Sequence, residues 1–163
     1  MGDRVRYDGE IKHFQQLCDK LEEVVDLIPI CPEVEIGLTV PRPPVQLTGN
    51  PARPRMTGRD DPTIDVTVPM TRYCQQRPQS LTGICGYVFK SRSPSCGIRD
   101  IPVFDGEQLV DANQSGLFAR AIIKHFPDLP IADETMLDTH QQRSHFLQQI
   151  LNYYNYIHKN QMP

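Results

Sequence analysis

Two cysteines of this 163-residue sequence lie in short polar turns whose neighbours suit chemistry on a thiol. Cys96 belongs to the segment Lys90-Ser91-Arg92-Ser93-Pro94-Ser95-Cys96-Gly97, with two basic residues and three serines close by. Nearby cations lower the pKa of a thiol and favour the thiolate, the form that attacks substrates and binds metals. The segment therefore indicates a reactive or metal-binding cysteine, and a phosphate-binding or purely structural turn is the alternative.

Cys31 lies in the second turn, Cys31-Pro32-Glu33, where a stiff proline separates the thiol from a carboxylate. Arg42 lies between two prolines in the proline-rich stretch that follows. Its guanidinium is rigidly presented, and its planar donors suit a carbonyl or a phosphate.

Apolar runs precede both turns and predict the strands that deliver them. Residues 84–89 predict a buried strand before the serine-rich turn, and residues 27–31 predict a short strand that ends at Cys31. Ligand sites of open α/β sheets lie at the carboxyl edge of the strands. We therefore expect Cys31 and Cys96 to converge at one edge of a parallel sheet.

The remaining pattern alternates helices with strands, which predicts an α/β fold with a mostly parallel, Rossmann-like sheet flanked by helices. The proline-rich residues 37–54 are expected to be mostly loop or edge strand, because proline cannot donate to a ladder. The first strand of the fold is expected to be missing, since the chain opens on a turn and a helix. The expected helices are residues 11–25, 67–79, 117–126 and a long C-terminal 138–159, and further strands are expected at 101–104 and 129–131. A strand over residues 65–69 is the alternative to the start of the second helix.

Composition excludes several classes of protein. The net charge of −3 provides no broad basic field, so neither DNA nor a membrane is an expected partner, and RNA is a less favoured one. The sequence has no signal peptide and no long apolar run, so a cytoplasmic location is expected. The five cysteines (Cys18, Cys31, Cys74, Cys85 and Cys96) include no C-x-x-C pair, which argues against a zinc ribbon.

Four motifs in matching order resemble the small bacterial family of TudS-like 2-thiouracil desulfurases, formerly a domain of unknown function. They are Val5-Arg6-Tyr7-Asp8-Gly9, Cys31-Pro32-Glu33, Gly37-Leu38 with Pro41-Arg42-Pro43, and the serine-rich segment 90–97. The resemblance implies a TudS-like desulfurase domain over residues 1–135 and a C-terminal helical extension or linker over residues 136–163.

The resemblance implies a 4Fe–4S enzyme that removes sulfur from a small thiolated pyrimidine such as 2-thiouracil. Three cysteines would hold the cluster, leaving one iron open for the thiocarbonyl sulfur. Cys31 and Cys96 match two of these metal ligands. The third would lie two residues upstream of Met1, so we expect an N-terminally short copy. A truncated or non-catalytic relative that acts as a binding module is the alternative.

The resemblance also assigns roles around the two ligands. Glu33 would handle protons as sulfur is replaced by oxygen, against the alternatives of a surface salt bridge or a helix cap. Ser93 and Ser95 would donate to the cluster or the substrate, or only to the turn. Lys90 and Arg92 would balance the cluster's charge or hold an anionic substrate, and Arg42 would bind substrate. A metal-free domain that grips a phosphate with the serine-rich turn is a further alternative.

Overall fold

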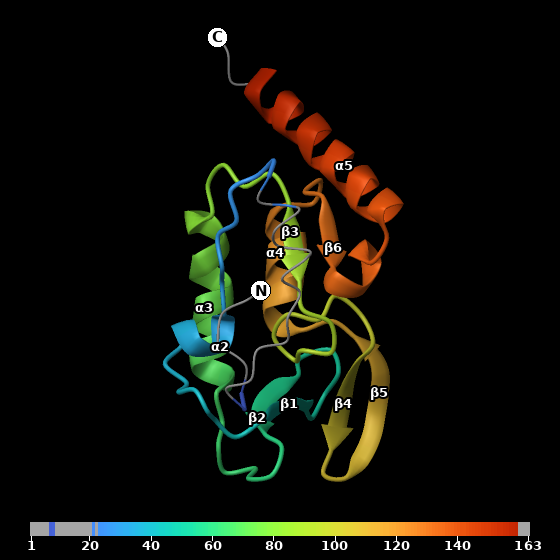
Figure 1. The fold of residues 1–163 in the computed structure, drawn as a ribbon. Helices are drawn as coiled ribbons and strands as arrows, with labels where there is room; N and C mark the ends of the chain where they lie inside the picture. The colour runs from blue at the N-terminus through green and yellow to red at the C-terminus, as the bar shows by residue number, and fades with distance from the viewer. Residues whose placement is uncertain (1–6, 9–20, 22, 160–163) are drawn as a thin grey trace.

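The computed structural model describes residues 7–8, 21 and 23–159, and Figure 1 shows their arrangement. The predicted helix over residues 11–25 lies almost entirely outside these residues. The elements in chain order are α2 (Pro32–Glu35), β1 (Val45–Thr48), β2 (Arg55–Gly58), α3 (Thr67–Ser80), β3 (Tyr87–Phe89), β4 (Ile101–Asp105), β5 (Gln108–Gln114), α4 (Leu117–His125), β6 (Ile131–Asp133), the 3-10 turn η1 (Glu134–Leu137) and α5 (His140–Lys159).

The strands form two small sheets. A four-stranded sheet has the order β2-β1-β4-β5, in which β1 and β4 are parallel and the two outer pairs are antiparallel. A two-stranded parallel sheet pairs β3 with β6, with Phe89 opposite Asp133. The α/β class flanked by helices is confirmed, but the strand pairing is mixed and not wholly parallel.

Three long helices follow the sequence pattern closely. In α3 the backbone N–H of Thr67 donates to Asp65 Oδ1 (2.9 Å), and Pro69 lies in the first turn. Proline is tolerated there because the first N–H groups of a helix have no intrahelical partner. Helix α4 ends just before Pro127, and α5 is the predicted long C-terminal helix. No helix within the described residues has the length and apolar character needed to cross a membrane.

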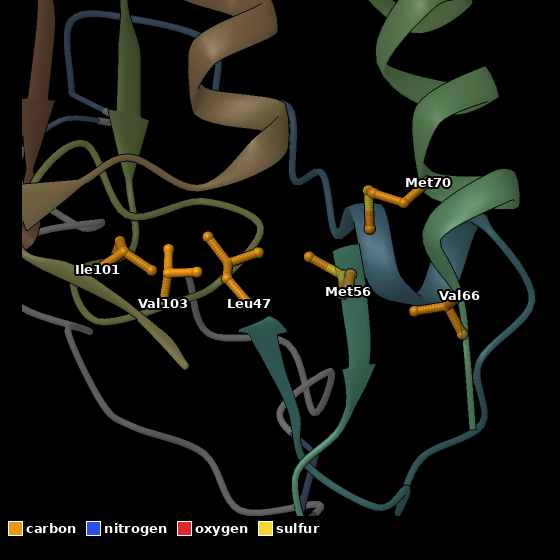
Figure 2. Close-up of a cluster of buried hydrophobic side chains, with 6 residues drawn as sticks. All are labelled: Leu47, Met56, Val66, Met70, Ile101 and Val103. Atoms are coloured by element: carbon orange, nitrogen blue, oxygen red, sulfur yellow. The ribbon is translucent and has the colours of Figure 1, made fainter. Parts of the chain in front are cut away.

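Buried side chains from both sheets and the helices form the core. One cluster joins the four-stranded sheet to α3 (Figure 2), and consists of Leu47, Met56, Val66, Met70, Ile101 and Val103. A second joins β3 to α4 through Phe89, Phe118, Ala119 and Ile122. Phe146 and Ile150 attach the first half of α5 to β6 and η1, while Leu151, Tyr154 and Tyr156 beyond them are exposed. The C-terminal end of α5 extends beyond the rest of the fold (Figure 1).

The structure corrects several elements of the sequence prediction. Residues 27–31 form no strand: they are irregular, and Ile28 is exposed, because Pro29 interrupts the run and no neighbouring strand pairs with it among the described residues. Strands β1, β2 and β5 were not predicted, and β1 is an interior strand within the proline-rich stretch. Strand β6 begins two residues later than expected, and β3 is shorter than residues 84–89.

Candidate functional site

Helix α2 positions the first cysteine and its carboxylate. Cys31 is the N-cap of this short helix and Pro32 occupies its first turn, a position that the fixed backbone of proline favours. The backbone N–H of Glu35 donates to the Cys31 carbonyl (2.9 Å), which closes the turn. Cys31 is thus delivered by a helix start, whereas the sequence predicted the end of a strand.

Glu33 is the centre of the site and is only 8% exposed. Its Oε2 accepts hydrogen bonds from Nε and Nη2 of Arg42, at 3.0 and 2.8 Å. Its Oε1 accepts one from the hydroxyl of Ser95 at 2.7 Å. Both carboxylate oxygens are therefore satisfied by protein donors, as a buried carboxylate requires.

Arg42 connects Glu33 with Cys31. Besides its two bonds to Glu33, its Nη2 lies 4.0 Å from the Cys31 sulfur, and its Nη1 donates to the Thr39 carbonyl (3.3 Å). Its backbone N–H donates to the carbonyl of Tyr7 (2.6 Å). With the side chain 4% exposed, the guanidinium is directed inward. A substrate role for Arg42 stays a prediction, and this geometry favours a positioning role.

The serine-rich turn brings Cys96 to the same carboxylate. The Oγ atoms of Ser93 and Ser95 lie 3.0 Å apart, and Ser93 Oγ accepts the backbone N–H of Cys96 (3.1 Å). The pKa of the Cys96 thiol is raised to about 12, mainly by burial; hydrogen bonds with Ser95 and Ser93 oppose this rise, and the nearby Glu33 and Cys31 contribute to it. The two cysteines therefore lie within electrostatic reach of each other, with Glu33 beside both.

The two basic residues of the turn are placed differently from each other. Lys90 forms an ion pair with Glu134, whose Oε1 also accepts from Ser91 Oγ (2.6 Å) and whose Oε2 accepts from the Ser91 backbone (2.7 Å). Arg92 is exposed, and within the described part of the chain it pairs with no carboxylate. The Lys90–Glu134 pair argues against a phosphate-binding site at this turn, since the Lys90 ammonium group already has an anionic partner.

Sequence reasoning missed Glu134, which is only 2% exposed and holds the start of the serine-rich turn. The signal was available in Asp133-Glu134, two acidic residues directly after a short apolar strand. The parallel pairing of β3 with β6 places this pair beside Lys90.

Acid should weaken the anchor that Glu134 provides. Burial alone raises the pKa of Glu134, but hydrogen bonds from Lys90 and Ser91 outweigh it and hold the pKa below its ordinary value of 4.5. A carboxylate with a depressed pKa stabilises the fold above its unfolded pKa and loses that contribution as the pH falls through the folded value. Glu134→Gln is expected to cost about 1–3 kcal/mol at pH 7. In denaturant unfolding of the metal-free protein, that difference should shrink below pH 4.5, and a pH-independent difference would contradict it.

The remaining cysteines show no arrangement for a shared site. Burial raises the pKa of Cys74 in α3 to about 12, and Cys85 Sγ donates to the Gly83 carbonyl (3.4 Å). Cys18 lies outside the described residues. Within the part of the chain that the structure describes, no three His, Cys, Asp or Glu side chains form a metal-holding group. Iron–sulfur clusters are held by cysteine thiolates, and the role of Cys31 and Cys96 as such ligands stays a prediction.

The fold and the site together define an α/β protein in which two cysteine turns meet around a buried carboxylate–guanidinium pair. The model of the 2-thiouracil desulfurase family matches residues 1–134, so the chain belongs to this family. Among solved structures, it is similar to the 4Fe–4S-dependent thiouracil desulfidase TudS, with 27% sequence identity and a TM-score of 0.64. That match covers 83% of this chain and 86% of the other. No match was found among curated proteins.

The comparisons confirm the family that the four motifs indicated. The family model carries the name of a thiouracil desulfurase, and the similar solved structure is named as an enzyme that depends on a 4Fe–4S cluster. They support an iron–sulfur desulfurase class and a 4Fe–4S cofactor for the family. The assignment of individual residues depends on the geometry above.

Proposed function

We propose that this protein removes sulfur from a thiolated pyrimidine such as 2-thiouracil, with Cys31 and Cys96 as ligands of a 4Fe–4S cluster. The observation that carries the proposal is the position of Glu33. Through Arg42 this carboxylate is linked to the Cys31 sulfur, and through Ser95 it is linked to the turn that holds Cys96. A buried carboxylate therefore connects the two segments that carry the proposed ligands.

A cluster held in part by Cys31 and Cys96 would supply an open iron with affinity for the thiocarbonyl sulfur. In the net reaction, a thiocarbonyl and one water give a carbonyl and one hydrogen sulfide, and no oxidant or reductant is needed. Water gives up both of its protons, and the departing sulfide takes both of them up. The protein must therefore move protons near the pyrimidine carbon, and this is the chemistry that we assign to the chain's own residues.

Two hydroxyls and one carboxylate provide a route for these protons. Ser93 Oγ lies 3.0 Å from Ser95 Oγ, which lies 2.7 Å from Glu33 Oε1. Hydroxyls can donate and accept at once, so a proton taken at Ser93 can be passed to Glu33. Arg42 holds the other oxygen of Glu33 and keeps Oε1 directed at Ser95. We assign Glu33, Ser93 and Ser95 to proton transfer.

The remaining assignments follow from this proposal. We place the desulfurase domain at residues 1–135 and a helical extension at residues 136–163. The substrate is a small thiolated pyrimidine and not DNA, because a chain with a net charge of −3 has little to attract a polyanion. Cysteine ligands must stay reduced, which favours the cytoplasm.

Anaerobic reconstitution with iron and sulfide tests the proposal. The wild-type chain should gain the brown absorption of an iron–sulfur cluster and convert 2-thiouracil to uracil with release of sulfide. Cys31→Ala and Cys96→Ala should each lose the absorption and the activity, because each removes a thiolate ligand. Cys85→Ala is the matched control and should retain both. If the wild-type chain takes up no more iron than Cys96→Ala, the proposal is wrong and the non-catalytic alternative is favoured.

A further inference from the structure

The turn that carries Cys96 lies directly across the N-terminus of α4. The first N–H groups of a helix have no partner within the helix. Here the N–H of Leu117 donates to the Pro94 carbonyl (3.1 Å), and those of Phe118 and Ala119 donate to the Ser95 carbonyl (2.9 and 3.1 Å). The turn and the helix therefore satisfy each other's backbone groups, and the position of one determines the position of the other.

Gly116, the N-cap of α4, is the point of closest approach between the two segments. A Cβ atom at this position would lie 2.5 Å from the Ser95 carbonyl carbon, 2.6 Å from its oxygen and 2.8 Å from the Cys96 nitrogen. These are backbone atoms, which cannot rotate away as a flexible side chain can. The Gly116 N–H also donates to the Gly97 carbonyl (2.7 Å).

The backbone conformation of Gly116 does not itself require glycine. Its φ of −62° and ψ of 152° are ordinary extended values that alanine adopts readily. What excludes a larger residue is the contact with Ser95 and Cys96 alone. By contrast, Arg92 within the turn and Asp100 after it have φ values of 59° and 56°, in the left-handed region that L residues rarely adopt. The turn is thus held in a conformation that its own residues do not favour.

Ser95 transmits the contact to the rest of the site. Its carbonyl caps α4, while its hydroxyl donates to Glu33 Oε1 (2.7 Å). A shift of the Ser95 backbone therefore moves the Cys96 thiol and the hydrogen bond to Glu33 together.

We propose that Gly116 is a positioning residue, which sets the place of Cys96 and Ser95 by letting the α4 N-terminus contact their backbone without a side chain between. The role of this positioning in catalysis rests on the proposed desulfuration, whereas the contact between Gly116 and the turn does not. The test therefore uses the metal-free protein and measures the cysteines directly.

The experiment is alkylation of Gly116→Ala by iodoacetamide under native conditions, with the rate at each cysteine read by mass spectrometry. We expect the rate at Cys96 to rise about tenfold, as its turn is pushed from the helix. The rate at Cys74, a partly buried thiol of α3, should stay unchanged. Global destabilisation would instead raise both rates together, so this ratio separates positioning from a structural role.

Gly86→Ala is the matched control. Its Cβ would come within 3.0 Å only of the side chain of Ile150, at 2.8 and 3.0 Å, so it adds the same methyl group without touching the turn. The ratio of the Cys96 and Cys74 rates should stay at the wild-type value in this variant. In folded Gly116→Ala, an unchanged Cys96 rate or parallel rises at Cys96 and Cys74 would overturn the proposal.

Ser115→Ala is a second test variant, to be used if Gly116→Ala does not fold. Ser115 Oγ donates to the Ile98 carbonyl (2.8 Å) and joins the same two segments one residue earlier. Its loss should raise the Cys96 rate by a smaller factor and leave Cys74 unaffected. A Cys96 rate equal to that of the wild type would overturn the proposal, whatever the desulfuration assay gives.

Discussion

Replacing Arg42 with leucine is expected to lower the free energy of unfolding by about 3–5 kcal/mol, because it leaves the carboxylate of Glu33 buried without its cation. Glu33 and Arg42 are each 8% exposed, so water cannot take the place of the lost guanidinium. Urea unfolding of the metal-free protein followed by circular dichroism measures the change.

Two further variants test the cause of that loss. Arg77→Leu also breaks an arginine–glutamate ion pair, in which Arg77 of α3 contacts Glu35 of α2 at 3.0 Å. The side chains of Arg77 and Glu35 are 27% and 34% exposed, so this pair is much closer to solvent. That loss should be no more than about 1 kcal/mol. The double variant Arg42→Leu with Glu33→Leu should recover much of the stability, since no charge is left unpaired. If Arg42→Leu costs no more than Arg77→Leu, the buried pair is not what holds this region.

The helices were predictable because local patterns determine them. Thr67 with Pro69 two residues later indicated the start of α3, and the apolar spacing of Phe146 and Ile150 indicated α5. The strands depended on pairing between distant segments, which a local pattern cannot reveal. Strand β5 is a largely exposed edge strand without apolar alternation, and residues 27–31 have apolar side chains but no described neighbour to pair with.

The same distinction applies to the candidate site. Cys31, Glu33 and Cys96 were found by residue type and motif, and the structure brings their segments together. The partners of the charged groups were not predictable: Arg42 pairs with Glu33 across nine residues, and Lys90 pairs with Glu134 across a parallel strand pair. The packing of the loops determines which basic side chain pairs with which acidic one. The sequence gives the residue types but not the distances between them.

Glu33→Gln is expected to reduce the turnover of 2-thiouracil by about 10²–10⁴-fold, the contribution typical of a positioned acid or base. Glutamine retains an oxygen that accepts from Ser95 but cannot take up a proton. Activity is measured as uracil formed by the reconstituted protein, and the iron–sulfur absorption is recorded on the same sample. That absorption should be retained, because Glu33 is not assigned as a cluster ligand.

Glu35→Gln is the matched control for this variant. Glu35 lies two residues further along α2 but points to the surface, where it accepts from Tyr73 Oη (2.9 Å) and Arg77 Nε (3.0 Å). Its substitution should leave turnover within about twofold of the wild type, as expected for a surface change of a few tenths of a kcal/mol. Turnover by Glu33→Gln equal to that of Glu35→Gln would place proton transfer elsewhere. Loss of the cluster in Glu33→Gln would instead assign this carboxylate to holding Arg42 and Ser95 around the two cysteines.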